Sequence, residues 1–317
     1  MDFRVWKTRV SENYPTPPKK TSTAGPKSST IAPVKHVLRI DDWFHPDGFP
    51  ISIERREPQE DFGPHTHEFA ELVIVLGGSG LHLSGNDSWK LGVGDVFVIA
   101  GPREHEYRDL DELRLVNILY QPKQLNMRLL DLPSVAGYHA LFTLEPARRT
   151  RQSTRLRLGG RDLARVTEMI DRLDEELRTR EPGFGFMATA SFMHIIGLLA
   201  RSYGSSPSPD HRATLRIGEA LSHLERHIHE DVNLDELANI AHMSRRSFLR
   251  VFQSATGTSP LAWRINQRVQ RACHLLRNSD KRITEIAFDV GFNDSNYFTR
   301  QFRQITGQSP REYRMRR

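Results

Sequence analysis

The sequence has a single cysteine among its 317 residues, Cys273. One cysteine cannot form an internal disulfide, so a disulfide-stabilised fold and a zinc finger built from cysteines are both excluded. The first residues, MDFRVWKTRV, lack the unbroken apolar core of a signal peptide. The longest segment without Asp, Glu, Lys or Arg, residues 182–200, contains a proline and three glycines, which favours a buried helix after a loop over a membrane span. We therefore expect a soluble, cytoplasmic protein with no membrane segment.

Positive charge is concentrated in the last third of the chain. Residues 213–317 carry 17 Lys and Arg against 11 Asp and Glu, whereas residues 37–212 carry 21 against 26. All but one of those 17 basic residues are arginines, whose planar guanidinium suits phosphates and guanine edges. This distribution predicts that only the C-terminal third contacts a polyanion.

Composition divides the chain into five segments. Residues 1–36 are rich in Pro, Ser, Thr and Lys and predict a disordered tail. Residues 37–158 begin with short runs of β-branched and aromatic residues between glycine-rich turns, which is typical of a small β-sandwich or barrel. Residues 159–203 change to helical periodicity, and residues 204–212 have the composition of a flexible linker. Residues 213–317 predict helices only.

The first helix predicted within 159–203 has apolar residues at alternating spacings of three and four. They are Leu163, Val166, Ile170, Leu173 and Leu177. This is the spacing of a short coiled-coil seam, so we expect a helical dimerisation segment. The alternative is a stripe that packs within its own chain, as every amphipathic helix must bury one face.

The C-terminal third contains an internal repeat, since residues 237–263 match residues 286–313. Each copy predicts a short helix, a turn that ends in a capping residue, and a longer helix that stops at a glycine, Gly257 or Gly307. A helix, a tight turn and a capped second helix make a helix-turn-helix motif. The sequence therefore predicts two such motifs, joined by one helix of about 17 residues.

Phenylalanine pairs four residues apart, such as Phe248 and Phe252, must face the core of each motif. The opposite faces then carry Arg245, Arg246, Arg250 and Gln253 in the first copy and Ser295, Asn296, Thr299, Arg300 and Arg303 in the second. Arg, Asn and Gln side chains read base edges in the major groove, and neighbouring arginines bind phosphates. A solvated helix face is the alternative for any single charged residue. Two copies favour double-stranded DNA as partner, with the recognition helices about one turn, ~34 Å, apart.

These motifs resemble the DNA-binding domain of the AraC/XylS transcription regulators. The resemblance covers residues 213–317 and rests on IAFDVGFNDSNYFTRQFRQITGQSPREYR, with GF before the second recognition helix and TGxSPxxYR at its end. It implies a transcription regulator and not an enzyme.

A second group of polar residues lies in FGPHTHEFAELVIVLGGSG, residues 62–80. His65, His67 and Glu71 are evenly spaced, which places them on one face of an extended chain, and His105 follows on an expected neighbouring strand. The arrangement resembles the two cupin motifs, although Ala100 stands where the second motif usually has proline. The resemblance implies a cupin-like barrel, in whose enzymes three histidines and the glutamate bind a divalent metal.

Three interpretations of this group compete. In a ligand pocket, His65, His67, Glu71 and His105 would bond to sugar hydroxyls, with His82 as a further member. In a metal-dependent cupin enzyme with an accessory DNA-binding domain, the first four would hold a divalent metal. The third interpretation is a remnant of an ancestral site without a present role. Fusion to a DNA-binding domain favours the effector pocket, and we expect no bound cofactor.

Most of residues 62–122 is similar to the L-rhamnose-responsive activators of the AraC/XylS family. That likeness implies a sugar effector such as L-rhamnose, a homodimer, and activation of promoters read by RNA polymerase. We therefore predict a multidomain protein with an N-terminal all-β cupin-like barrel, a helical dimerisation segment and a C-terminal all-α double helix-turn-helix domain. Its expected function is ligand-responsive regulation, as an activator, of carbohydrate-utilisation genes.

Overall fold

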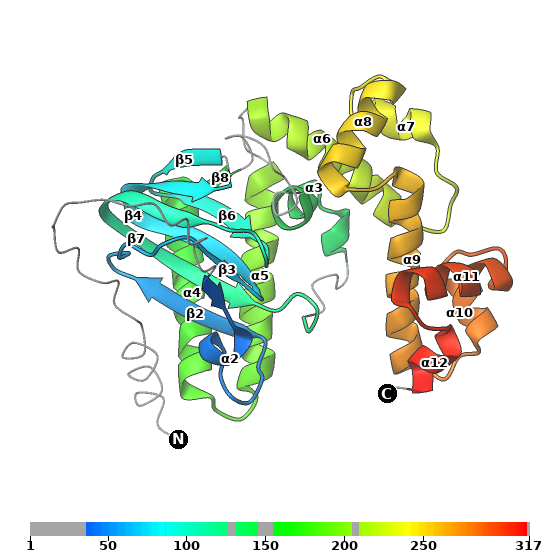
Figure 1. Cartoon of the computed structure of the whole chain (residues 1–317), viewed down its shortest axis with the longest axis horizontal. Helices are drawn as coiled ribbons and strands as arrows, with labels where there is room; N and C mark the ends of the chain where they lie inside the picture. Colours follow the sequence, from blue (N-terminus) through cyan, green and yellow to red (C-terminus); the bar gives the residue numbers. More distant parts are fainter. Residues whose placement is uncertain (1–35, 86, 126–130, 145–154, 205–208, 316–317) are drawn as a thin grey trace, which may run out of the picture. The chain divides into compact units, whose positions relative to one another are not determined.

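The computed structural model describes residues 36–85, 87–125, 131–144, 155–204 and 209–315 (Figure 1). Apart from His36, the tail predicted at 1–36 lies outside these residues, as do residues 205–208 of the predicted linker. The chain divides into two compact units. The first is Met1–Met127 with Arg157–Ile195, and the second is Arg128–Leu156 with Ile196–Arg317.

The first unit is built on one large, mostly antiparallel sheet. Strands β2, β7, β4, β6 and β8 lie in that order, with β5 paired to β4, while β1 and β3 form a separate parallel pair. The elements are β1 (His36–Leu38), α2 (Ile40–Trp43), β2 (Ile51–Arg56), β3 (His65–His67), β4 (Ala70–Ser84), β5 (Asp87–Leu91), β6 (Asp95–Ile99), β7 (Glu106–Tyr120), β8 (Leu156–Arg157), α4 (Gly160–Thr179) and α5 (Phe184–Gly204). The predicted N-terminal β domain is confirmed.

Both faces of this sheet are covered, which explains why the first half of β4 shows no alternation of apolar and polar residues. Residues 72–75 are fully buried. Helices α4 and α5 run along one face (Figure 1), where the Phe192 ring lies 5.2 Å from that of Tyr120. Arg55 of β2 adds an ion pair of 2.9 Å to Asp174 of α4. The other face carries a second apolar cluster that includes Phe97.

The apolar stripe of α4 packs inside its own chain. Val166, Ile170, Leu173 and Leu177 are at most 5% exposed, and Leu163 is half-buried. The same spacing serves a coiled-coil seam or an intramolecular contact, and here it forms the contact between α4 and the rest of the first unit. A dimer built on α4 would therefore use another face of that helix.

Among the described residues, α5 is the one helix long and apolar enough to cross a membrane, with 33% of its apolar window buried. A single helix of this kind is weak evidence for a span, because core helices of water-soluble domains have the same length and composition. Phe192, Ile195, Ile196 and Leu199 of α5 are fully buried in the protein. The buried side of α5 therefore agrees with the core helix expected from the sequence.

The second unit is all helical and contains both predicted helix-turn-helix motifs. Its elements are η1 (Leu132–Ser134), α3 (Ala136–Tyr138), the π-helix η2 (His139–Leu144), α6 (Pro209–Arg226), α7 (Leu234–Ile240), α8 (Arg245–Thr256), α9 (Pro260–Asn278), α10 (Ile283–Asp289), α11 (Ser295–Thr306) and α12 (Pro310–Met315). The predicted C-terminal all-α domain is confirmed. Each motif has an apolar core of its own, around Phe248 and Phe252 in the first and Phe298 and Phe302 in the second.

Residues 131–144 belong to the second unit, whereas we expected them in the sensor domain at 37–158. They pack on α6, and Leu144 is fully buried in the same core as Phe248 and Phe252 of α8. Two glycines allow α3 to approach its neighbouring helices closely. A Cβ on Gly137 of α3 would overlap the carbonyl oxygen of Ala200 in α5. A Cβ on Gly218 of α6 would lie 2.5 Å from the carbonyl oxygen of Ala136 in α3.

This contact gives a first prediction, Gly218→Ala. Alanine favours a helix over glycine by about 1 kcal/mol, yet its methyl would overlap the α3 backbone, so we expect a net loss of about 1–3 kcal/mol of stability. Gly197→Ala in α5 is the matched control because a Cβ there meets no atom within 4 Å. Denaturant unfolding should show Gly218→Ala less stable and Gly197→Ala at least as stable as the parent protein. Equal stability of the two variants would contradict the close contact.

Candidate functional site

The two helix-turn-helix motifs are closed by the predicted caps. Ser244 accepts a bond from the Ser247 amide (3.3 Å) at the start of α8, and Asp294 accepts one from the Tyr297 amide at the start of α11. Both helices end at glycines with left-handed backbones, φ 74° and 76°. In the turn between the helices of each motif, His242 and Gly291 also take positive φ. The two copies thus have caps and left-handed backbone at the same positions.

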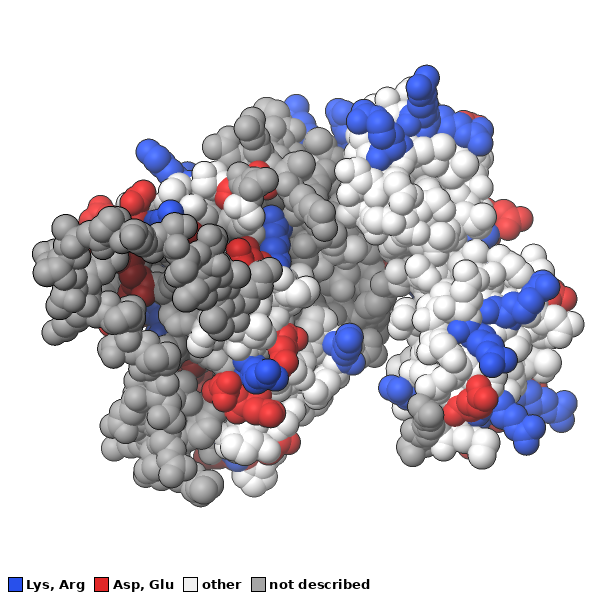
Figure 2. Space-filling model, in the orientation of Figure 1, with Lys and Arg blue, Asp and Glu red and all other residues white. Residues whose placement is uncertain are grey.

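The predicted core and surface faces of α8 and α11 are confirmed. All four phenylalanines of the two pairs have zero exposure. The polar residues predicted opposite them are exposed or half-buried: Arg245, Arg246, Arg250, Gln253, Ser295, Asn296, Thr299, Arg300 and Arg303. Figure 2 shows Lys and Arg side chains over both α7–α8 and α10–α11 of this unit. Both faces are therefore open to a polyanion.

Three of these nine side chains also bond within the protein. Gln253 donates to the Gly257 carbonyl oxygen (3.0 Å) at the end of α8, and Thr299 donates to that of Ser295 (2.9 Å). Arg245 donates to the Asp235 carboxylate on α7 (3.3 Å). Gln253 lies in the last turn of its helix, whereas recognition helices contact bases mainly from their first turns. We therefore place Gln253 at the edge of the candidate interface.

The first unit brings together the polar residues predicted for the sensor. His65, His67, Glu71, His82 and His105 are at most 6% exposed. They come from β3, β4 and the turn before β7, and a pair of backbone hydrogen bonds of 3.0 Å between His65 and His105 holds the two segments together. The even spacing of the first three residues predicted the shared face. The juxtaposition of His105 required the tertiary fold.

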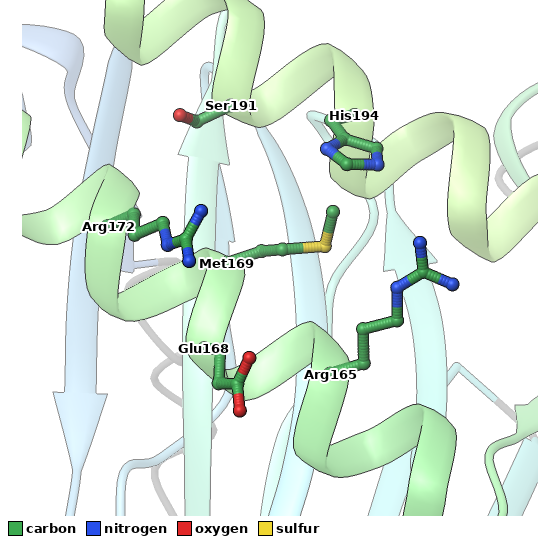
Figure 3. Close-up of a pocket in the computed structure, with 6 residues that line it drawn as sticks. All are labelled: Arg165, Glu168, Met169, Arg172, Ser191 and His194. Carbon is green, nitrogen blue, oxygen red and sulfur yellow. The ribbon is translucent and has the colours of Figure 1, made fainter.

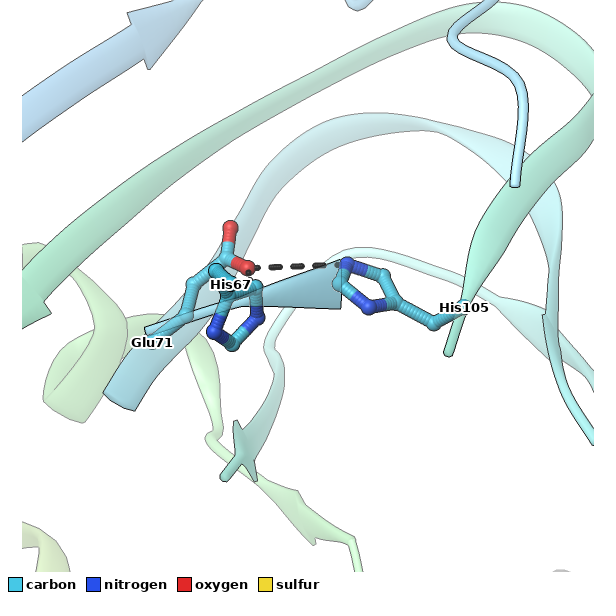
Figure 4. A group of neighbouring side chains, drawn as sticks. All are labelled: His67, Glu71 and His105. Atoms are coloured by element: carbon cyan, nitrogen blue, oxygen red, sulfur yellow. Dashed lines mark ion pairs between the residues drawn. The ribbon is translucent and has the colours of Figure 1, made fainter. Parts of the chain in front are cut away.

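Glu71 lies beside two of these histidines, His67 and His105 (Figure 4). Its Oε2 atom is 3.3 Å from Nε2 of His67 and 3.6 Å from Nε2 of His105. Burial lowers the pKa of His105 well below its usual value, and the neighbouring His65, His82 and His67 lower it further. Burial also lowers the pKa of His65. Neutral imidazoles have a free ring nitrogen, which accepts a hydrogen bond or binds a metal.

His82 connects the group to a cluster of packed aromatic rings. Its ring lies 4.2 Å from that of Trp89, 5.1 Å from that of Tyr107 and 5.4 Å from that of His105, with which it stacks. Burial, followed by the negative charge of Glu71, raises the pKa of Tyr107 well above its usual value. Its phenol is therefore neutral at pH 7. Apolar rings beside a few convergent polar groups are typical of small-molecule sites.

His67, Glu71 and His105 offer ligand atoms that all lie within 4.8 Å of one another, and they are the one such group among the described residues. Metal–ligand bonds of about 2.0–2.1 Å in a tetrahedral zinc site place neighbouring ligand atoms about 3.4 Å apart. The separations of 3.3 and 3.6 Å fit that edge length. The residues present therefore fit a divalent metal as well as a polar organic ligand.

Family comparisons match two regions of the chain. The AraC-like ligand binding domain matches residues 51–177, and a helix-turn-helix domain matches residues 237–316. The transcriptional activator RhaR of Escherichia coli strain K12 is 30% identical over 282 residues, which cover 88% of this chain and 97% of RhaR. The chain belongs to the AraC family. It is therefore a ligand-responsive, DNA-binding transcription regulator, and the alternative of a cupin enzyme is rejected because the relatives are transcriptional activators.

Two solved structures illustrate the similarity. The DNA-binding domain of AdpA, in complex with a target DNA, is 40% identical, covers 32% of this chain and 91% of that chain, and has a TM-score of 0.30. Wild-type ToxT from Vibrio cholerae, with an unsaturated fatty acid bound, is 14% identical over 84% of this chain and 94% of that chain, with a TM-score of 0.33.

This AraC-family chain also has a surface cavity that we did not predict. It lies between α4 and α5, has a volume of about 230 Å³, and is lined by Arg165, Glu168, Met169, Arg172, Ser191 and His194 (Figure 3). None of these residues belongs to the predicted effector group, which lies on the sheet. Mixed charge at an open surface gives no preference for one kind of ligand.

Sequence reasoning missed one feature of the DNA-binding unit. Arg264 and Arg268 count toward the basic charge of the last third, yet both are only 6% exposed. The two arginines are four residues apart and therefore lie on one face of α9, a helix that contributes residues to both apolar cores. This spacing could have indicated their burial. These two arginines form contacts inside the protein. The positive charge that a polyanion could reach lies on exposed residues such as those of α8 and α11.

Proposed function

We propose that this regulator activates carbohydrate-utilisation genes in the cytoplasm when its first unit binds a sugar such as L-rhamnose. The relative RhaR is named a transcriptional activator, which supports activation over repression. The likeness of residues 62–122 to L-rhamnose-responsive activators supports a sugar effector. His67, Glu71, His82 and His105 supply buried donors and acceptors of the kind that bind hydroxyl groups, beside the aromatic rings that suit a sugar face.

The second part of the proposal is that α8 and α11 enter two successive major grooves. The observation that carries it is the duplicated polar face, exposed in both copies and joined by α9. The 19 residues of α9 span about 28 Å, which with the helix widths matches one turn of DNA. A homodimer would place four recognition helices on one operator and would present its activating surface to RNA polymerase.

Two binding experiments test this function. Isothermal titration of the full-length protein with L-rhamnose and related sugars should show a saturable site for one of them. Genomic fragments retained by the protein should then include promoters of genes for the use of that sugar. Saturable binding of a non-sugar metabolite in place of every sugar would contradict the effector class without affecting the DNA-binding assignment.

A divalent metal held by His67, Glu71 and His105 is a second candidate for the sensor site. The separations of 3.3 and 3.6 Å between their ligand atoms favour it. A bound metal would polarise a ligand hydroxyl and lower its pKa. The imidazoles of His67 and His105 and the side chain of Glu71 would hold the ion, and the aromatic rings around His82 would exclude water from it.

Elemental analysis separates the two candidates. If the site holds a metal, protein purified without chelator contains about one equivalent of Zn²⁺, Mn²⁺ or Fe²⁺, and chelator lowers its thermal stability. If the site binds sugar directly, the protein is free of metal and chelator leaves both stability and sugar affinity unchanged. His194→Ala on α5, remote from the group and exposed, is the control for a general effect of removing histidine.

A further inference from the structure

Two buried arginines of α9 bind the backbone that follows α6. Arg268 donates from Nε to the Ile228 carbonyl oxygen (2.7 Å) and from Nη2 to the Glu230 carbonyl oxygen (3.2 Å). Arg264, one turn earlier, also donates to the Glu230 carbonyl oxygen. The end of α6 is the base of the first helix-turn-helix, so these bonds anchor α9 to that motif.

Their burial makes these bonds costly to lose. Both arginines are 6% exposed, and fully buried arginines are rare unless they are paired. Burial, together with the nearby charge of Arg264, lowers the pKa of Arg268 to about 10. Arg268 therefore stays charged at pH 7 and requires the carbonyl oxygens. Hydrogen bonds from a charged guanidinium to carbonyl oxygens are stronger than those between neutral groups.

Arg268 also contacts the second helix-turn-helix. Its Cζ atom lies 5.7 Å from the ring centroid of Phe292, in the turn before α11. The neighbouring Gly291 has φ 95°, and a Cβ on it would lie 3.0 Å from both Nε of Arg268 and the Cα of His229. The turn that leads into the second recognition helix therefore packs directly on Arg268 and on the backbone after α6.

The apolar cores of the two motifs do not supply this connection. Among the described residues, the core around Phe248 and the core around Phe298 share no residue, and α9 runs through both. Each core packs on α9 separately. The contacts of Arg268 add a direct link from the end of α6 to the turn before α11, which opposes movement of one motif relative to the other.

We propose that Arg268 is a positioning residue, which fixes the orientation of α11 relative to α8 and so sets the spacing at which two DNA half-sites are read. The inference rests on the proposed reading of two grooves. It assigns no DNA contact to Arg268 itself, which is buried. A specific consequence is that a variant without this contact should tolerate half-sites at the wrong spacing.

The test uses the full-length protein and a bipartite duplex obtained by selection from random DNA. Single base pairs are inserted between the half-sites, each of which moves one half-site by about 3.4 Å and about 34°. Parent protein should lose at least about tenfold in affinity for the first insertion, and Arg268→Met less than about threefold. Affinity for a duplex with a single half-site should stay within about twofold of the parent.

Gly291→Ala provides a second variant in case Arg268→Met fails to fold, as judged by circular dichroism. Its methyl would push the turn away from Arg268 and should relax the spacing requirement in the same way. Gly307→Ala is the matched control, because φ is 76° and a Cβ there meets no atom within 4 Å. It should keep the steep spacing dependence of the parent protein.

The possible results distinguish failure of the role of Arg268 from failure of the proposed reading of two major grooves. A parent protein that binds one half-site as tightly as two would overturn the reading of two grooves. A parent protein with steep spacing dependence, together with a folded Arg268→Met or Gly291→Ala that is equally steep, would overturn the role of Arg268 alone.

Discussion

Arg250→Ala should remove protection over one half of a bipartite DNA site and leave the other half protected. Arg250 is exposed on α8, opposite the buried Phe248 and Phe252. Loss of one base-reading contact is expected to cost about 1–3 kcal/mol, or roughly fivefold to 150-fold in affinity. Arg246→Ala should affect the same half, since it lies in the first turn of the same helix.

The reciprocal variants test the second recognition helix. Asn296→Ala and Arg300→Ala, both exposed on α11, should remove protection over the other half. Arg277→Ala is the charge-matched control. Arg277 is exposed in the same unit but lies on α9, outside α8 and α11, with its guanidinium carbon 4.7 Å from the Tyr313 ring centroid. If both groups of variants lost protection over the same base pairs, the two helices would not read separate half-sites.

His67→Ala and His105→Ala should raise the concentration of sugar needed for a response by roughly fivefold to 150-fold. Each removes a buried partner of Glu71 and, at the proposed effector site, of the sugar hydroxyls, at a cost of about 1–3 kcal/mol. Affinity for DNA without sugar should stay near that of the parent protein, because no residue of the DNA-binding faces is changed.

Calorimetric titration with L-rhamnose, with and without chelator, measures this effect, and thermal unfolding confirms that each variant is folded. His194→Ala should bind sugar normally. If metal is present, added Zn²⁺ should restore the variants, whereas more sugar should not. Unchanged sugar affinity in both variants would place the pocket elsewhere in the first unit.

The DNA-binding unit could be predicted well from sequence because its signals are local. Caps such as Ser244, the glycines that end α8 and α11, and phenylalanines four apart all act within one or two helical turns. Repetition of the same pattern fixed the register of the second copy. The comparison of two copies also separated the core face from the exposed face without any tertiary information.

Long-range contacts escaped prediction. The docking of residues 131–144 depends on close backbone approach at Gly137 and Gly218, which composition does not distinguish from ordinary helix glycines. The apolar stripe of α4 has the same spacing whether it pairs with a second chain or packs inward. Burial of Arg268 depends on carbonyl oxygens 38 and 40 residues away along the chain. None of these three contacts could be recognised without the three-dimensional structure.

Hydroxyl-radical footprinting of the full-length protein on its selected duplex tests the central claim most directly. If α8 and α11 read two successive major grooves, each protein chain should protect two short stretches about one turn, ~10 base pairs, apart on one face of the DNA. Arg250→Ala should abolish one stretch and Arg300→Ala the other. A single protected stretch per chain, lost equally in both variants, would contradict the account.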